Sequence, residues 1–203
     1  MGRKSLHVYG PRGTGSFVDS LFKGAFKADI ESRTVLQTSE GIADIQVSEF
    51  TEGQVCQGKG WEVTALRVIH PLDSVAFRLD SAHHSLVISG DTGYYPPLAS
   101  FARGANVLVQ ECTMSLPFSQ WAARRTAGRT DKIDASLEKW WSKLSKIHCT
   151  PSEAAQIAQE AQIDTLVLTH FLPRTDPGYV ANECGRHFQG QIIIGEDLLE
   201  IEC

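Results

Sequence analysis

The sequence is poor in the features that mark several common classes of protein. Its five cysteines are scattered and contain no Cys-x-x-Cys pair, which argues against a disulfide framework or a zinc knuckle and favours reduced thiols. No apolar run reaches the length of a membrane span or of a signal-peptide core. The formal net charge is −5, so no overall positive field attracts nucleic acid or an anionic membrane. We therefore expect a cytoplasmic protein without membrane association, in which any polyanion binding is local.

The composition is that of an ordinary globular protein. Hydrophobic residues make up 42% and charged residues 21% of the 203 residues, both close to globular averages. A chain of this length can bury a sizeable core and fits one domain. We expect a single domain over residues 1–203.

A strand that ends in a carboxylate organises the predicted site. Residues 85–88 are mostly aliphatic and lead into Ser89-Gly90-Asp91-Thr92, which predicts a buried strand with Asp91 at its end. A hard oxygen donor on a rigid strand suits a divalent cation. The alternative is a turn aspartate that bonds its own backbone, and this stretch alone does not decide between the two.

Two further predicted strands end in a histidine. Residues 63–69 lead to His70, and residues 165–169 lead to His170. A lone histidine at a strand end is usually structural, but imidazole and carboxylate are typical zinc ligands, and catalytic sites often gather them from distant strand ends. Three strands that end in His, Asp and His therefore favour a metal site. We expect His70, Asp91 and His170 to be its ligands, with zinc as the metal.

Five segments occur in the order and approximate spacing of the metallo-β-lactamase fold hydrolases. They are residues 70–78, 89–92, 107–113, 148–155 and 166–171. The chain most resembles the ribonuclease Z-like branch and its phosphodiesterase relatives. The resemblance implies an α/β fold, the αββα sandwich of that superfamily, and metal-dependent hydrolysis of a phosphodiester. It also implies two metals in complete members, with Asp91 bridging both and His70 and His170 each binding one.

The resemblance also assigns an acid–base pair. Gln110-Glu111-Cys112-Thr113 stands where the family often has His-Glu-Ala-Thr, and His148-Cys149-Thr150 matches its His-Ser-Thr position. By this resemblance Glu111 orients His148, and His148 protonates the leaving oxygen. An imidazole oriented by a carboxylate suits general acid catalysis because imidazole titrates near neutral pH. The alternative is a structural Glu–His pair.

One signature of the family is missing. No His-x-His-x-Asp-His segment occurs in the chain, and residues 6–13 resemble the stretch that follows this segment in the family. The resemblance therefore implies a sandwich without its N-terminal strands, weak or absent metal binding and impaired activity. The competing hypothesis is a non-catalytic product or pseudoenzyme that keeps the fold for ligand binding or interaction. Bared strand edges and apolar side chains lead us to expect a homo-oligomer through residues 42–80 and 6–9.

Local patterns predict the other elements. Residues 42–80 are expected to form an antiparallel meander of strands. We expect helices over 17–26, 96–102, 151–161 and 179–188, and further strands over 6–9, 106–110, 191–194 and 198–202. Thr150-Pro151-Ser152-Glu153 is a capping box that starts the third of these helices. The glycine-rich turn over 10–15 lacks phosphate-loop spacing and is interpreted as a tight turn, and His83 and His84 are expected to face solvent.

The segment 116–147 has the most individual composition. It contains seven Lys or Arg against three acids, and Leu137, Trp140, Trp141, Leu144 and Ile147 recur at helical spacing. A tryptophan stripe is more often core than ligand platform, but the segment leads into His148 and its basic face could meet phosphate as a lid. No basic arm for transfer RNA is visible between residues 24 and 60. We therefore expect a small or single-stranded anionic phosphodiester as substrate.

Overall fold

The computed structural model describes residues 4–36, 42–126 and 135–201. Its internal contacts divide the chain into two compact units, Met1–Val55 and Cys56–Cys203. The single domain expected over residues 1–203 stays a prediction. Within the described ranges, no helix has the combination of length and apolar character that crossing a membrane requires.

The first unit is a two-stranded sheet with a helical connection. Strand β1 (Lys4–Pro11) leads through α1 (Thr14–Asp19), the π-helix η1 (Ser20–Ala25) and α2 (Lys27–Leu36) to β2 (Ile42–Phe50). The turn over residues 10–15 is held by Glu49, whose Oε1 accepts hydrogen bonds from the N–H groups of Gly13 (3.0 Å) and Gly15 (2.9 Å). A carboxylate of the protein thus occupies the donors that a phosphate loop would offer, in agreement with the interpretation as a tight turn.

The predicted meander is wrong for residues 42–50. Strand β2 pairs with β1 in parallel, with Leu6 opposite Ile45 and Tyr9 opposite Ser48. Alternating residues indicate a strand but do not identify its partner, and the helical segment between β1 and β2 supplies the crossover that parallel pairing needs. The helix predicted over 17–26 is also interrupted, because the N–H of Phe26 bonds to the carbonyl of Leu21, five residues back (2.8 Å).

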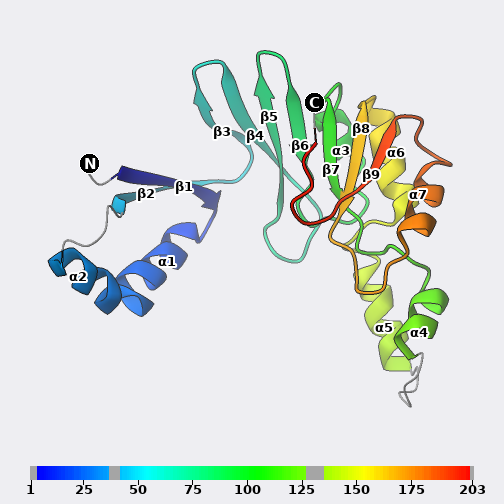
Figure 1. Ribbon diagram of the computed structural model, residues 1–203, viewed down its shortest axis with the longest axis horizontal. Coiled ribbons are helices and arrows are strands. Elements are labelled where there is room, and N and C mark those ends of the chain that lie inside the picture. Colours follow the sequence, from blue (N-terminus) through cyan, green and yellow to red (C-terminus); the bar gives the residue numbers. More distant parts are fainter. Residues whose placement is uncertain (1–3, 37–41, 127–134, 202–203) are drawn as a thin grey trace. The chain divides into compact units, whose positions relative to one another are not determined.

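A seven-stranded mixed sheet forms the larger unit (Figure 1). Its strands in spatial order are β3 (Gly53–Gly58), β4 (Trp61–Arg67), β5 (Val75–Ser81), β6 (Ser85–Ile88), β7 (Val107–Glu111), β8 (Thr165–Thr169) and β9 (Gln191–Ile194). Pairs β4–β5 and β5–β6 are antiparallel, whereas β6–β7, β7–β8 and β8–β9 are parallel. Strands β4, β6, β7 and β8 therefore all run in one direction. Their carboxyl ends share one edge of the sheet, and this edge carries the predicted site residues.

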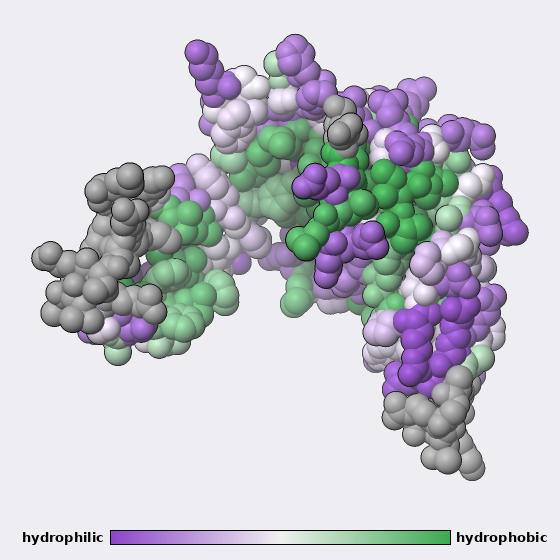
Figure 2. Space-filling view, in the orientation of Figure 1, coloured by the Kyte–Doolittle hydropathy of each residue, from purple (hydrophilic) through white to green (hydrophobic). Residues whose placement is uncertain are grey.

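Three helices cover one face of this sheet: α3 (Pro97–Phe101), α6 (Pro151–Ala161) and α7 (Pro177–Cys184). The core lies between these helices and the sheet. Its fully buried members include Val87, Leu98, Leu108, Ile157, Leu166, Leu168 and Val180. The buried face of α6 is rich in alanine, which lets the helix approach the strands closely. Figure 2 shows a hydrophobic area over the sheet on the side that faces the viewer.

The individual segment 116–147 contains a helical pair, α4 (Phe118–Thr126) and α5 (Ala135–Leu144), drawn at the lower right of Figure 1. Trp121 and Trp141 belong to a second buried cluster with Met114 and Leu116, which agrees with a core role for part of the tryptophan stripe. Trp140, in contrast, is 41% exposed. Helix α5 ends at Leu144, before the predicted Ile147, and residues 127–134 lie outside the described residues.

The strand predicted over 198–202 is wrong where the structure describes it. Asp197 and Leu198 form a turn, and Leu198 has a φ of 65° with its side chain 98% exposed. Aliphatic residues suggested a strand, but a left-handed backbone position interrupts the extended conformation that a sheet requires. Glu202 lies outside the described residues.

The predicted capping box at the start of α6 is confirmed. The Thr150 hydroxyl accepts from the N–H of Glu153 (3.3 Å), and the Glu153 carboxylate accepts from the N–H of Thr150 (2.9 Å). We expect Thr150→Ala to lower the free energy of unfolding by about 1 kcal/mol, because two N-terminal N–H groups lose an ordered arrangement. Urea denaturation measures the loss. Thr150→Ser, which keeps the hydroxyl, is the control, and an Ala variant as stable as the Ser variant would contradict the assignment.

Candidate functional site

All five predicted site residues lie together at the carboxyl edge of the seven-stranded sheet. The ring centroids of His70 and His148 are 5.6 Å apart, as are those of His148 and His170. Nδ1 of His148 lies 3.2 Å from Oε1 of Glu111, and Nδ1 of His170 lies 3.3 Å from Oδ1 of Asp91. Residues distant in sequence thus form one continuous polar cluster.

The Asp91 turn depends on a glycine. Gly90 has a φ of 60°, and a Cβ atom at this position would lie 2.6 Å from the carbonyl oxygen of Val75. Only glycine fits both the left-handed backbone and the close approach of β5. The turn is also joined to the neighbouring strand, because the Ser89 hydroxyl accepts from the N–H of Glu111 (3.0 Å). Asp91 is therefore held at a defined place, although its side chain is 45% exposed.

The loop that carries His70 is bound to the Asp91 loop. The N–H of Ile69 donates to the Thr92 hydroxyl (3.2 Å), and the N–H of Gly93 donates to the carbonyl of Ile69 (3.0 Å). These two bonds set the separation of His70 from Asp91. Nδ1 of His70 makes a long contact of 3.4 Å with the N–H of Leu72. Nε2 is then the ring nitrogen left for a ligand.

The Glu111 carboxylate binds three backbone N–H groups. Oε1 accepts from Cys149 (2.9 Å) and Thr92 (3.3 Å), and Oε2 accepts from Thr113 (2.9 Å). These donors belong to the segments after β6, after β7 and before α6. Since Glu111 is only 3% exposed, its negative charge is balanced by these dipoles and by His148 rather than by water. Its oxygen atoms are thus already engaged within the protein.

His148 is buried beside this carboxylate, with 7% of its surface exposed. When Nδ1 donates to Glu111, Nε2 is the nitrogen left for another partner. The ring lies between those of His70 and His170, and the N-terminus of α6 follows two residues later. This is the arrangement of an imidazole oriented by a carboxylate.

His170 has an unusual backbone for a residue other than glycine, with a φ of 60°. The Thr113 hydroxyl donates to its carbonyl oxygen (3.0 Å) and lies 3.0 Å from its Nδ1. With that hydroxyl proton used, Nδ1 carries the ring proton toward Asp91 or Thr113, and Nε2 keeps a free lone pair. The side chain is 50% exposed, so this lone pair is accessible from solvent.

The donor set fits a borderline divalent cation such as zinc. One ligand atom each from Glu111, His148 and His170 lies within 4.8 Å of the others. Glu111, however, is occupied by backbone donors, so we regard it as an orienting group. Among the described residues, His70 and Asp91 are not part of this close group, and their role as ligands beside His170 stays a prediction. Their imidazole and carboxylate are donor types that zinc accepts.

Neighbouring cysteines do not compete as ligands. Cys112 and Cys149 are buried next to Glu111, and desolvation raises the pKa of both thiols well above the ordinary value, with further increases from nearby negative charge. Burial likewise raises the pKa of Cys184 to about 12. The thiols therefore stay protonated at neutral pH, while metal binding requires thiolate.

Sequence reasoning missed the supporting residues Ser89, Thr92 and Thr113. Each is a small hydroxyl residue next to a predicted site residue, which gave no signal beyond turn propensity. Thr113 belongs to the Gln110–Thr113 motif, but its residue type alone indicates no role there. His83 and His84, by contrast, are exposed, as predicted.

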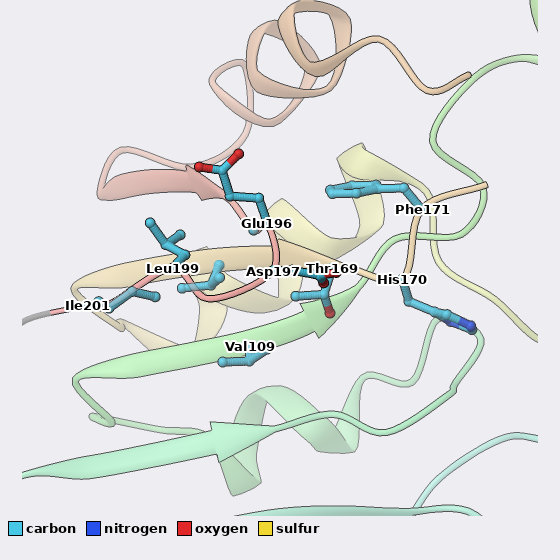
Figure 3. A pocket seen from close by; sticks show the side chains of 10 residues that line it. Val109, Thr169, His170, Phe171, Glu196, Asp197, Leu199 and Ile201 are labelled. Carbon is cyan, nitrogen blue, oxygen red and sulfur yellow. The ribbon is translucent and has the colours of Figure 1, made fainter. Parts of the chain in front are cut away.

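A cavity of about 440 Å³ borders the cluster at His170 (Figure 3). Its lining includes Val109, Leu199 and Ile201 together with Glu196 and Asp197. The His170 ring points away from these apolar side chains in Figure 3. The two carboxylates make this side of the cluster unfavourable for an anionic group.

Comparison with known proteins agrees with this arrangement. The family described as the beta-lactamase superfamily domain matches residues 2–171. Ribonuclease Z of Mycobacterium sp. (strain KMS) is 30% identical over 203 residues, covering 97% of this chain and 66% of that protein. Ribonuclease Z of Mycobacterium marinum (strain ATCC BAA-535 / M) is 31% identical over 207 residues, covering 97% and 67%. The chain thus spans about two thirds of the length of these relatives.

Solved structures show the same fold. The metallo-β-lactamase fold protein YhfI from Bacillus subtilis superposes with a TM-score of 0.63 at 23% identity, covering 96% of this chain and 64% of that one. Human tRNase Z, short form, gives a TM-score of 0.57 at 18% identity, covering 98% and 66%. Both confirm the expected α/β fold class. On the family match and the ribonuclease Z relatives together, the chain belongs to the metallo-β-lactamase superfamily, in its ribonuclease Z-like branch.

Proposed function

We propose that this chain carries part of the catalytic site of a metal-dependent phosphodiesterase. The observation that supports the proposal most directly is the juxtaposition of a buried Glu111–His148 pair with the half-buried His70 and Asp91 and the exposed His170 at one sheet edge. The Glu111–His148 pair is buried, and backbone N–H groups hold its carboxylate in place. His70, Asp91 and His170 are more accessible to solvent and offer imidazole nitrogen and carboxylate oxygen atoms as ligands.

The two groups of residues have different roles. His70, Asp91 and His170 would hold the divalent cation, which when bound lowers the pKa of a coordinated water and offsets charge on the phosphoryl oxygens. As the imidazolium, His148 would donate its Nε2 proton to the leaving oxygen, and Glu111, by accepting from Nδ1–H, would orient the ring and stabilise its cationic form. Water is largely excluded from this pair by burial, so the proton donor keeps one orientation.

The ribonuclease Z relatives support a phosphodiester as the substrate. A small or single-stranded phosphodiester fits better than a folded transfer RNA, because the chain is acidic overall and no basic arm stands out between residues 24 and 60. The expected homo-oligomer stays a prediction.

Hydrolysis of bis(p-nitrophenyl) phosphate with added Zn²⁺ or Mn²⁺ tests the function. We expect release of nitrophenolate that stops with chelator and is lost in Asp91→Asn, which removes a charged ligand but keeps the side-chain shape. Asp73→Asn is the matched control, since Asp73 is an exposed partner of Arg67 outside the cluster. Absence of metal-dependent hydrolysis would favour the non-catalytic alternative, for which the missing His-x-His-x-Asp-His segment is the supporting observation.

Metal content gives an independent measurement. We expect fewer than two zinc ions per chain after dialysis, with affinity weaker than that of a fully enclosed site, because only one carboxylate and two imidazoles are proposed as ligands and two of the three are half exposed. Elemental analysis after dialysis decides the stoichiometry, with Asp73→Asn again as the reference and His170→Ala as the depleted variant. Two tightly held ions per chain would show that further ligands exist.

A further inference from the structure

A second cavity, of about 360 Å³, lies beside the cluster and is not used by the proposed chemistry. It is lined by Trp121, Arg125, Trp140, Leu172, Pro173 and Arg174. The volume is at the lower end of the range of about 300 to 1,000 Å³ typical of small-ligand sites.

The aromatic side chains form a partly open platform. The Trp121 and Trp140 ring centroids are 5.8 Å apart, with their planes inclined by 35°. Trp121 is buried in the core of the helical pair, whereas Trp140 is 41% exposed and therefore has ring surface available for contact. An exposed indole face offers stacking to a flat ligand without any rearrangement of the core.

The positive charge is also held in place. The Arg125 guanidinium carbon lies 5.3 Å from the Trp121 ring centroid, within the range of a cation–π contact. Arg174 donates to the carbonyl oxygens of Arg124 (2.7 Å) and Arg125 (2.9 Å). Within the described residues, neither Arg125 nor Arg174 has a carboxylate partner. Both guanidinium groups thus contribute positive charge to the lining of this cavity.

The platform is tied to the catalytic edge by a reciprocal clamp. Arg124 donates to the Arg174 carbonyl (3.2 Å) and to Asp176 (2.9 Å), so the end of α4 and the loop after His170 hold one another. Asp176 also caps α7, and its pKa is lowered chiefly by the Arg124 hydrogen bond. Since Leu172 and Pro173 follow His170 by two and three residues, the cavity begins within about 11 Å of that residue along the chain.

Charge distinguishes this cavity from the one in Figure 3. The cavity in Figure 3 is lined by the carboxylates of Glu196 and Asp197, whereas the tryptophan cavity is lined by two arginines. Figure 2 shows hydrophilic residues gathered over the α4–α5 pair. A polyanion that reaches the catalytic edge therefore meets favourable charge at the tryptophan and arginine cavity and unfavourable charge at the cavity shown in Figure 3.

We propose that this cavity binds one nucleotide of a single-stranded nucleic acid whose neighbouring phosphodiester lies at the catalytic edge. The base stacks on Trp140, and its phosphate pairs with Arg125 and Arg174. Stacking on an aromatic face is tolerant of base identity, so the site recognises a single strand rather than a sequence. The inference rests on the proposed phosphodiesterase function and specifies its substrate as single-stranded nucleic acid.

Binding of a 5′-fluorescein-labelled adenylate trinucleotide, measured by anisotropy in EDTA, tests the inference without any turnover. We expect Trp140→Leu to weaken binding roughly tenfold, within the range of base–aromatic stacking, and Trp140→Phe to restore most of it. Arg125→Gln is expected to weaken binding and to reduce the salt slope by about 0.7, as loss of one phosphate contact on a single strand does. Trp61→Leu is the control, because Trp61 is comparably exposed on β4 but does not line the cavity.

Competition identifies the chemistry of the ligand. Unlabelled adenosine monophosphate should displace the probe, and inorganic phosphate at the same concentration should not. Equal displacement by phosphate, or wild-type affinity in Trp140→Leu with its fold confirmed by circular dichroism, would overturn the inference. Bis(p-nitrophenyl) phosphate has no nucleobase, so its hydrolysis reports on the proposed function alone and the two hypotheses can fail separately.

Discussion

Replacement of Glu111 by Gln is expected to destabilise the protein and to inactivate it together. The carboxylate accepts from the N–H groups of Thr92, Thr113 and Cys149 and contacts His148 in a buried position. Glutamine keeps the shape, but its NH₂ group must face at least one of these donors. Leaving a buried donor unpaired and weakening the charge-assisted bonds should lower the free energy of unfolding by about 2 to 4 kcal/mol.

Urea denaturation at neutral pH measures this loss. Glu160→Gln is the matched control, since Glu160 lies exposed near the end of α6 and should change stability by less than about 0.5 kcal/mol. If the Glu111 and Glu160 variants were equally stable, the carboxylate would not join the three loops in the way the hydrogen bonds indicate.

Replacement of His148 by Gln should separate activity from stability. Three backbone N–H groups still bind Glu111 in this variant, so the free energy of unfolding should fall by only about 1 kcal/mol. Hydrolysis of a dinucleotide, whose alkoxide leaving group needs a proton, should slow by roughly 10² to 10⁴-fold. Hydrolysis of bis(p-nitrophenyl) phosphate should slow by less than about tenfold, because nitrophenolate leaves without protonation.

The contrast between the two leaving groups is the diagnostic result. His83→Gln, at an exposed histidine in the turn before β6, should leave both rates unchanged. Equal slowing of both substrates in the His148 variant would assign the histidine to binding or metal coordination instead of proton donation.

Strand ends could be predicted from the sequence because their signals are local. Residues 85–88, 106–110 and 165–169 are short, mostly aliphatic runs followed by turn or polar residues, and they appear as β6, β7 and β8 within one residue of these bounds. The parallel direction of β6, β7 and β8 then brings Asp91, Glu111 and His170 to one edge. The Thr150 capping box is another local signal, and it begins α6 where expected.

Other features depend on contacts that a local pattern does not contain. The pairing of β2 with β1 joins residues about forty apart, and alternation is the same whichever partner a strand takes. The N–H groups around Glu111 are backbone atoms, so no side-chain pattern announces them. The tryptophan and arginine cavity likewise needs α4, α5 and the loop after His170 to meet, and only the helical spacing of the tryptophans was visible in advance.

The left-handed backbone of His170 gives this position a cost in stability that does not depend on the function of the ring. A residue other than glycine at a φ of 60° is disfavoured by roughly 1 to 2 kcal/mol. Substitution of His170 by glycine should therefore remove this conformational cost, and nothing would oppose the substitution in a protein that no longer uses the imidazole. A lineage that abandons the site should lose this histidine early, and one that keeps it is retaining an unfavourable conformation for the sake of the ring.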